Sequence, residues 1–322
     1  MNITKYKDYN NLLYFLYIKY KKIKMKVKEY NNKKLDNTEI MKKVQQDYNK
    51  FTGKNLDWSK LETYNEKMQW SKINNDVPFK TILSDKYKVR AWVKTAIGEE
   101  YLIPILGVWD NYKEIDFDYL PNKFVLKTNN ASGSNLIVKD KKNFNSFRAK
   151  LFFDMWLSVN FAYLNGFQMQ YKRIEPKIIA ESFIADSNGE LNDFKFLCFD
   201  GKPYYCWVDF DRFEDHKRNV YDMDWNLQPW NQHNYSNTDF TIEKPKNFEL
   251  MKDLVKRLSA GLGQVRVDLY NVDGKIYFGE MTFTNGNGFE LIKPDEYNLK
   301  LGQLWSLENE KKVNKIESSS KT

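Results

Sequence analysis

The chain has 322 residues, of which 51 are Lys or Arg and 43 are Asp or Glu, giving a formal net charge of +8. Hydrophobic residues at 42% and charged residues at 29% are typical of a soluble globular protein, which excludes a wholly disordered chain. No apolar run approaches the roughly 18 residues of a transmembrane helix, and the start lacks a signal-peptide cleavage site, so we expect a cytoplasmic protein. Cys198 and Cys206 are too few for a disulfide framework and lack metal-site spacing.

The positive charge is concentrated at one end of the chain. Residues 1–50 contain 13 Lys, no Arg and 5 acidic residues, whereas basic and acidic residues balance over residues 51–322. Nucleic-acid-binding proteins more often spread Lys and Arg over a folded face, and bidentate contacts to phosphates and bases rely on Arg. The distribution therefore argues against nucleic acid as a partner.

The basic segment, residues 1–45, is predicted to form an amphipathic extension. Leu12, Phe15, Leu16, Ile23 and Val27 fall near one face of a helix, and the lysines fall largely elsewhere. Two interpretations remain open. Residues 1–35 lie on the anionic inner face of a membrane as a peripheral contact, or the apolar stripe packs on the rest of the protein.

After this segment the pattern predicts helices first and a mixture of strands and helices later. Helices are expected at residues 65–73, 84–97, 144–165 and 248–260, with Ser84 as an N-cap and Gly261 as a stop signal. Strands are expected at residues 123–127, 136–138, 177–180, 194–199, 203–210, 265–270 and 276–282, followed by a polar, frayed tail from Asn309. This order predicts an α+β fold rather than a helical bundle or a β-sandwich.

The loop between the first two predicted strands is small and polar. It follows Lys127, and residues 129–135 are Asn, Ala, Ser and Gly only. Such a loop can point backbone N–H groups at a polyphosphate. It is not a P-loop, because Gly-Lys-Ser/Thr is missing and a strand follows it. The alternative is an ordinary hairpin turn.

The last predicted hairpin carries two acidic residues that an ion could bridge. Side chains alternate along a strand, so Arg266 and Asp268 share one face, as do Glu280 and Thr282. A three-residue turn would place Asp268 opposite Glu280, whereas a two-residue turn would send them to opposite faces. Facing carboxylates repel each other unless a cation lies between them, and Mg²⁺ is often held by one or two carboxylates. The hairpin therefore indicates a magnesium site, with a solvated surface hairpin as the alternative.

Other acidic pairs indicate a different class of enzyme. Asp209 with Asp211, and Asp222 with Asp224, form Asp-x-Asp pairs, which hold a metal and a sugar nucleotide in some glycosyltransferases. Such pairs also arise by chance in a chain with 43 acidic residues. A metal-dependent nucleotide-sugar glycosyltransferase of surface polysaccharide synthesis therefore stays open as an alternative.

The order of several motifs resembles that of ATP-grasp ligases. The motifs are Ser84-Asp85-Lys86, Phe124-Val125-Leu126-Lys127 with its loop, Ile179-Ala180-Glu181-Ser182-Phe183-Ile184, Arg266-Val267-Asp268 and Gly279-Glu280. More narrowly, residues 64–70, 107–110, 193–196 and 273–280 resemble the TupA-like ATP-grasp family, which is named for teichuronopeptide synthesis and linked to bacterial surface polysaccharides. The resemblance covers about residues 55–304.

The resemblance implies an ATP-grasp fold, in which two α+β lobes clasp ATP. It divides the chain into the extension at residues 1–45, a helical part at 46–100, a first lobe with the phosphate loop at 101–184, a second lobe with the metal hairpin at 185–308 and a polar tail at 309–322.

The resemblance also implies roles for individual residues. Those expected to bind ATP are Lys86, Lys127, Ser132, Gly133, Ser134, Asn135, Glu181, Ser182, Phe183, Ile184, Asp193 and Lys195. The two first-named lysines would contact phosphates, and residues 181–184 would form the hinge around adenine. Asp268, Glu280 and Thr282 would bind Mg²⁺, although ATP-grasp enzymes usually have Asn at the position of Thr282.

The implied reaction is ADP-forming ligation through an acyl phosphate, with an amide as the product. The expected catalytic arginines are Arg266, Arg212 and Arg218, and His216 and Asn285 are expected to bind substrate. The expected substrates are a uronic-acid carboxylate of a capsular or other surface polysaccharide, or of its precursor, and an amino acid or other amine.

Overall fold

The computed structural model describes residues 10–187, 191–210, 217–232, 235–238, 240 and 242–310, without the side chains of residues 192 and 210. Its α-helices are α1 (Asn11–Lys33), α2 (Asn37–Thr52), α3 (Tyr64–Asn74), α4 (Pro78–Ser84), α5 (Val89–Ala96), α6 (Ser146–Leu157), α7 (Phe248–Ser259) and α8 (Asp295–Gln303). Short 3₁₀ helices are η2 (Glu99–Tyr101), η3 (Tyr112–Glu114), η4 (Phe117–Tyr119), η5 (Lys141–Asn143), η6 (Phe161–Tyr163), η7 (Met169–Tyr171) and η8 (Asn285–Gly288).

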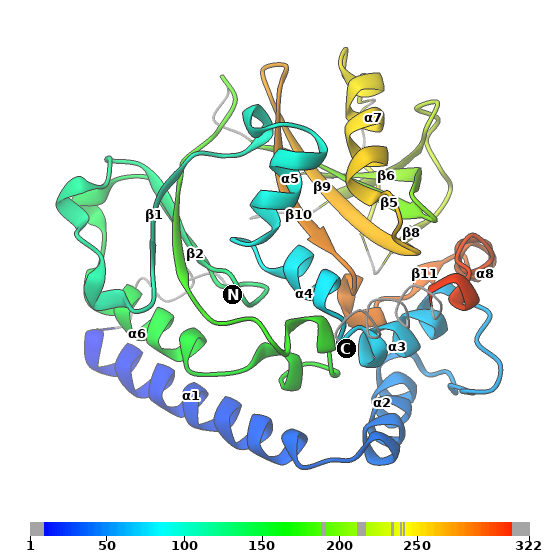
Figure 1. The fold of residues 1–322 in the computed structure, drawn as a ribbon, viewed down its shortest axis with the longest axis horizontal. Coiled ribbons are helices and arrows are strands. Elements are labelled where there is room, and N and C mark those ends of the chain that lie inside the picture. The colour runs from blue at the N-terminus through cyan, green and yellow to red at the C-terminus, as the bar shows by residue number, and fades with distance from the viewer. Residues whose placement is uncertain are drawn as a thin grey trace.

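The strands form antiparallel sheets. They are β1 (Ile105–Trp109), β2 (Phe124–Thr128), β3 (Asn135–Val138), β4 (Ile178–Ser182), β5 (Asn192–Phe199), β6 (Lys202–Phe210), β7 (Lys217–Asp222), β8 (Asn231–Gln232), β9 (Gln264–Val272), β10 (Lys275–Thr282) and β11 (Ile292–Lys293). Within the described residues the strand orders are β1-β4-β2-β3, β10-β9-β5-β6-β7 and β11-β8 (Figure 1). Each strand predicted from the sequence is present, and the α+β fold is confirmed.

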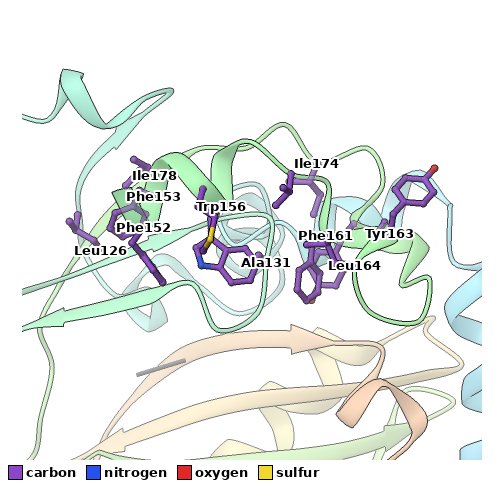
Figure 2. Packing of buried hydrophobic residues seen from close by; sticks show 14 of the residues in the cluster. Leu126, Ala131, Phe152, Phe153, Trp156, Phe161, Tyr163, Leu164, Ile174 and Ile178 are labelled. Carbon is purple, nitrogen blue, oxygen red and sulfur yellow. The ribbon is translucent and has the colours of Figure 1, made fainter. Parts of the chain in front are cut away.

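Aromatic side chains of α6 pack against the four-stranded sheet. Phe152 and Phe153 are fully buried and lie toward Leu126 of β2 and Ile178 of β4 (Figure 2). Burial of each such ring removes enough apolar surface from water to stabilise the fold by about 2–3 kcal/mol. One face of this sheet therefore carries a hydrophobic core, to which side chains of α1 and α2 also contribute.

The five-stranded sheet has one apolar face and one charged face. Alternate side chains, such as Phe196 of β5 and Val267 of β9, are buried in the core that includes α7. The side chains between them, Lys195 on β5 and Arg266 and Asp268 on β9, lie on the other face because side chains alternate along a strand. The pattern that builds the core thus also gathers charge on one surface of the sheet.

The face of α1 that packs on the protein is not the apolar stripe predicted from the sequence. Its buried side chains are Tyr14, Ile18, Glu29 and Asn32. The expected stripe, Leu12, Phe15, Leu16, Ile23 and Val27, is 36–64% exposed. The interpretation that this stripe packs on the rest of the protein is therefore wrong, because the helix has a second apolar face and that face meets α6.

The helix predicted at residues 84–97 is interrupted. Ser84 is the last residue of α4 rather than an N-cap, and α5 begins only at Val89. Between them the carboxylate of Asp85 accepts hydrogen bonds from the backbone N–H groups of Tyr87 at 2.8 Å and Lys88 at 3.1 Å. These side-chain bonds compete with helical ones and hold a turn at this point.

The ends of the predicted segments also differ in part. The boundary expected between residues 45 and 46 falls inside α2. The tail expected to fray from Asn309 is held at Glu310, whose buried carboxylate contacts Lys80 and the indole N–H of Trp305. Among the described helices, none combines the length and the apolar composition that crossing a membrane requires; α1, the longest, contains seven lysines.

Candidate active site

The turn between β9 and β10 has two residues rather than three. Asp273 and Gly274 form it with φ values of 49° and 89°, the left-handed conformations that such a tight hairpin turn requires. Of the two turn lengths considered from the sequence, the three-residue turn is therefore absent. A regular ladder continued from this turn would place Asp268 and Glu280 on opposite faces of the sheet.

A β-bulge nevertheless brings the two acids together. The register shifts between Phe278 and Glu280, after which Glu280 pairs with Asp268. The extra residue is Gly279, where a Cβ atom would lie 3.1 Å from the carbonyl oxygen of Asp268 and 3.1 Å from the ring of Tyr270. Glycine allows this close approach, so the acidic pair depends on the bulge and not on turn length.

The guanidinium of Arg266 lies between the two carboxylates. Its Nε and Nη2 each donate to an oxygen of Asp268 at 2.6 Å, and Nη2 also donates to Glu280 Oε1 at 2.9 Å. Further bonds run from Nη2 to Thr282 Oγ1 at 3.1 Å and from Nη1 to Asn285 Oδ1 at 2.8 Å. The Thr282 hydroxyl donates to Glu280 Oε1 at 2.9 Å. Arg266 thus balances the charge of the pair and is itself held on several sides.

The two acids differ in pKa and in exposure. Burial raises the pKa of Asp268 to about 6, although the charge of Arg266 opposes this. Burial also favours a higher pKa for Glu280, but Lys86, Arg266 and the Thr282 hydroxyl outweigh it and lower the pKa to about 2. The Glu280 side chain is 39% exposed and that of Asp268 4%. Glu280 is therefore the more acidic and the more accessible member of the pair.

Lys86 brings a positive charge to this hairpin from the first third of the chain. It lies in the turn between α4 and α5, and its Nζ donates to the carbonyl oxygen of Ala131 at 2.6 Å. Together with Glu280 and Tyr171 it lines a small cavity. Burial lowers the pKa of Lys86, and the Glu280 carboxylate opposes that shift. The turn, the polar loop and the hairpin therefore meet at one place.

Asn129 ties the Lys86 turn to the polar loop, and the sequence analysis gave it no role. Its Nδ2 donates to Asp85 Oδ1 at 3.0 Å and to the carbonyl oxygen of Glu175 at 2.9 Å. Its Oδ1 accepts from the N–H of Lys177 at 2.7 Å, and its carbonyl oxygen accepts from the N–H of Lys86 at 3.2 Å. The only sequence signal for this role is an asparagine close behind the strand predicted at residues 123–127.

Lys127 forms an ion pair across the four-stranded sheet. Its Nζ lies 2.6 Å from Glu181 Oε2, with side chains 12% and 8% exposed, and Arg90 Nη1 lies 3.8 Å from Glu181 Oε1. Glu181, expected in the hinge, is thus held by cations, while Lys127 and Lys86 lie close enough for their charges to interact.

A comparison with protein families decides which family the chain belongs to. The model of the TupA-like ATP-grasp family matches residues 66–306. The chain belongs to this family. The resemblance seen in the sequence motifs is therefore confirmed, and with it the ATP-grasp fold. No curated protein matches the chain in the comparison made.

Solved ATP-grasp ligases are among the structures that are similar to this TupA-like chain. D-alanine–D-alanine ligase from Bacillus anthracis in complex with ATP is 18% identical, with a TM-score of 0.43, over 73% of this chain and 67% of that one. The ATP-grasp ligase PsnB, complexed with its minimal precursor, Mg and ADP, is 12% identical, with a TM-score of 0.38, over 65% and 52%. N5-carboxyaminoimidazole ribonucleotide synthetase from Thermus thermophilus is 11% identical, with a TM-score of 0.36, over 63% and 45%.

The polar loop of the TupA-like fold presents some of its residues and buries one. Ser132, Gly133 and Asn135 are exposed, and Gly133 has a φ of 73°. Ser134 is buried, and its Oγ accepts a hydrogen bond of 2.7 Å from Thr128 Oγ1. Ser134 therefore uses its hydroxyl to hold the loop, while its neighbours face solvent.

The expected hinge follows β4. Ser182, Phe183 and Ile184 are half-buried. The N–H of Ser182 donates to the carbonyl oxygen of Pro104 at 3.0 Å, and Lys123 Nζ lies 6.0 Å from the ring centroid of Phe183. The segment leaves the four-stranded sheet here and leads toward β5.

Asp193 and Lys195 belong to a second charged group of the TupA-like fold. Lys195 Nζ donates to Asp193 and to Asp209 Oδ2, the latter at 2.6 Å. Arg218 donates to Asp209 Oδ1 at 2.5 Å through Nε and to Oδ2 at 3.0 Å through Nη2. All four residues are buried. Asp209 is therefore engaged by two cations, an arrangement that does not favour the Asp-x-Asp site of a glycosyltransferase.

Arg218, expected to be catalytic, stacks against aromatic rings. The Arg218 guanidinium lies 4.7 Å from the ring centroid of Trp207 and 4.4 Å from that of Tyr235. Its stacked, ion-paired position is that of a structural group rather than of a catalytic arginine. Arg212, His216 and Asp211 lie outside the described residues.

Asn285 is in the site but faces Arg266. It accepts from Arg266 and donates through Nδ2 to the hydroxyl oxygen of Tyr64 at 2.9 Å. Both Asn285 and Tyr64 are buried. Asn285 therefore positions the arginine, and the buried Tyr64 behind it is a further residue that the sequence analysis missed.

The donor set at the hairpin fits a hard divalent cation. Asp268 and Glu280 supply carboxylate oxygens and Thr282 a hydroxyl oxygen, which are the ligand types that Mg²⁺ prefers. Glu280 offers an ion its 39% exposed side, whereas both oxygens of Asp268 are engaged by Arg266. Within the described part of the chain, no group of three or more His, Cys, Asp and Glu side chains forms a potential metal site.

Proposed function

We propose that this TupA-like protein is an ATP-dependent, ADP-forming carboxylate–amine ligase. The observation that carries the proposal is the meeting of Lys86, the loop after Lys127 and the Arg266–Asp268–Glu280 group in a member of an ATP-grasp family. These groups come from three separate parts of the chain. Together they offer cations for phosphates and carboxylates for a metal ion.

The reaction proceeds in two displacements. A substrate carboxylate oxygen attacks the γ-phosphorus of ATP, the bond to the bridging β,γ-oxygen breaks, and ADP leaves with that electron pair. An amine nitrogen then attacks the acyl carbon, phosphate leaves with the electrons of the acyl–oxygen bond, and the nitrogen loses a proton. Lys86 and Lys127 bind phosphate oxygens, and the exposed backbone around Ser132 and Gly133 covers them.

Arg266 stabilises the negative charge that develops during both displacements. Burial alone lowers the pKa of a guanidinium, but Asp268 and Glu280 outweigh it and raise the pKa of Arg266. The residue is therefore permanently charged and held in a fixed orientation. Fixed charge costs no reorganisation when the transition state forms.

Asp268 and Glu280 would hold Mg²⁺, with Thr282 beside them. When bound there, the ion supplies charge neutralisation for the phosphate oxygens. The protein's own part is to keep Glu280 ionised, which Lys86 and Arg266 do.

The acceptor we propose is a uronic-acid carboxylate of a capsular or other surface polysaccharide, or of its precursor, and the amine an amino acid or a related compound. The support for this is membership in the TupA-like family, because the resemblance of the sequence motifs to that family implies a surface-polysaccharide substrate. That family association supports the choice of the two substrates, whereas the geometry of the site supports the reaction class.

Calorimetry with ATP in the presence and absence of Mg²⁺ tests the nucleotide half. The wild-type protein should bind ATP more tightly with Mg²⁺, and Glu280→Gln should weaken that binding at least about tenfold. The 39% exposure of Glu280 predicts little change in thermal stability. Glu249→Gln, at an exposed carboxylate of α7, is the matched control and should bind like wild type.

Two outcomes would contradict the proposal. Binding of UDP-glucose or UDP-glucuronate with no response to ATP would favour the glycosyltransferase alternative. ATP binding without ADP release, when uronic acids and oligosaccharides containing them are screened with amino acids, would reject the proposed substrate pair.

A further inference from the structure

α1 is fixed on the protein by one face. Tyr14 and Ile18 on that face are 0% and 2% exposed. Lys22 Nζ donates to the carbonyl oxygen of Asp154 on α6 at 3.3 Å, and Asn32 Nδ2 donates to that of Tyr163 at 2.6 Å. The helix therefore cannot rotate freely, and its opposite face points away from α6 along the outer edge of the molecule (Figure 1).

That opposite face is apolar along most of the helix. We call it the outer stripe; its residues and their exposed fractions are Leu12 64%, Leu16 51%, Tyr20 65%, Ile23 56%, Val27 54% and Tyr30 61%. At 100° and 1.5 Å per residue these side chains fall within an arc of about 80° and extend over about 27 Å. Exposed apolar residues are usually scattered singly, so a continuous stripe of this length indicates a docking surface.

Lysines surround the outer stripe. Lys19, Lys24, Lys26, Lys28 and Lys34 are exposed. The only acidic residue of α1, Glu29, is buried and lies 2.6 Å from Lys33 Nζ. Residues 1–50 carry the whole net charge of +8, while the rest of the chain is balanced. The charge around the stripe is therefore strongly positive.

We propose that the outer stripe docks α1 in the interface of an anionic membrane. Its leucine, isoleucine and valine side chains enter the boundary between headgroups and acyl chains, its tyrosines lie at headgroup level, and the lysines contact anionic lipids. Two copies of the chain joined by this face would bring the same lysines together and repel each other. An anionic lipid surface instead matches both the apolar and the charged parts.

Sedimentation of the full chain with vesicles tests the proposal. Vesicles of phosphatidylcholine with phosphatidylglycerol should bind the wild type, and phosphatidylcholine alone should bind it much less. Combining Leu16→Asp with Ile23→Asp should weaken binding to the mixed vesicles at least about tenfold. Leu250→Asp, at a leucine of α7 that is 45% exposed, is the matched control and should bind like wild type.

A second variant tests the charged part. Combining Lys19→Gln with Lys24→Gln should weaken binding several-fold and reduce its sensitivity to NaCl. Circular dichroism and ATP binding should be unchanged in every variant, because these side chains face outward. Deleting α1 is a poorer test, since it would also uncover the surface of α6 that Tyr14 and Ile18 bury.

Three results would overturn the proposal. One is equal vesicle binding by the Leu16→Asp, Ile23→Asp variant and the wild type. Another is equal binding to vesicles with and without phosphatidylglycerol. The third is a wild-type dimer in light scattering that the double variant converts to a monomer, which would make the outer stripe an interface between copies of the chain.

Discussion

Two charged groups lie on the same face of the five-stranded sheet and differ in their access to solvent. In the closed group, Asp193, Lys195, Asp209 and Arg218, the side chains are 1–6% exposed. In the open group, Arg266, Asp268, Glu280 and Thr282, exposure reaches 12% for Arg266 and 39% for Glu280. Both groups pair carboxylates with cations, so charge pairing alone does not mark an active site.

The difference shows what each group does. In the closed group the ion pairs are almost fully buried and join side chains of strands β5, β6 and β7. In the open group Glu280 keeps a side toward solvent, where a ligand can enter. The groups are adjacent, since Lys195 pairs with Asp268 across the sheet. The closed group thus supports β9, the strand that carries Arg266 and Asp268 of the open group.

The largest expected effect comes from breaking the closed group with Asp209→Asn. The substitution leaves Lys195 and Arg218 buried with one negative charge fewer, and loss of one partner of a buried ion pair costs about 3–5 kcal/mol. Urea unfolding at neutral pH measures the loss. Glu249→Gln, which breaks only exposed ion pairs at the start of α7, should change the free energy of unfolding far less.

Acid should remove the stability that the ion pairs of Asp209 contribute. Burial favours a higher pKa for Asp209, but the hydrogen bonds and charges of Arg218 and Lys195 outweigh it and hold the pKa well below its usual value. A depressed folded-state pKa stabilises the protein above the unfolded-state pKa of about 4, and this stabilisation disappears as the pH falls toward the folded-state value. The stability difference between wild type and Asp209→Asn should therefore shrink below about pH 4. A difference that stays constant would show that Asp209 contributes by packing alone.

Gly279→Ala tests the geometry of the open group. A Cβ at this position would lie 3.1 Å from the carbonyl oxygen of Asp268, so β10 must shift at the bulge that aligns Glu280. We expect Mg²⁺-dependent ATP affinity to fall about tenfold, with a stability loss of about 1–3 kcal/mol. Calorimetry and urea unfolding measure the two effects.

Gly274→Ala in the same hairpin is the matched control. Its φ of 89° makes alanine strained, but nothing lies within 4 Å of an added Cβ. It should therefore cost stability while leaving ATP affinity unchanged. If both variants lost ATP affinity equally, the position of Glu280 would depend on the whole hairpin and not on the bulge.

The charged and apolar faces of the five-stranded sheet could be predicted from the sequence. Alternation puts Phe196 and Val267 on one face and Lys195 and Asp268 on the other, and this holds in the structure. The bulge at Gly279 could not be predicted in this way, because alternation assumes an unbroken ladder. The sequence made the acidic pair conditional on a three-residue turn, whereas the chain forms the pair on a two-residue turn with a bulge.

Other features depend on contacts between distant segments. The sequence places Asp209 beside Asp211 and so suggests a metal, whereas strand order places it beside Lys195 and Arg218. Periodicity found one apolar face of α1 but could not say which face would be buried. Asn129 escaped notice because its role requires two other segments to lie against it.

The smallest expected effect separates positioning from metal binding at Thr282. Thr282→Val keeps the shape and removes the hydroxyl that donates to Glu280 and accepts from Arg266. Arg266 keeps its bonds to Asp268 and Asn285, so a positioning role predicts a loss of ATP affinity of less than about tenfold. A loss as large as that of Glu280→Gln would instead make Thr282 a metal ligand. Thr282→Asn then gives the independent check. If Thr282 binds the metal, the amide oxygen of Asn should preserve the effect of Mg²⁺ on ATP binding. If Thr282 only positions Glu280 and Arg266, Asn should not replace its hydroxyl hydrogen bonds.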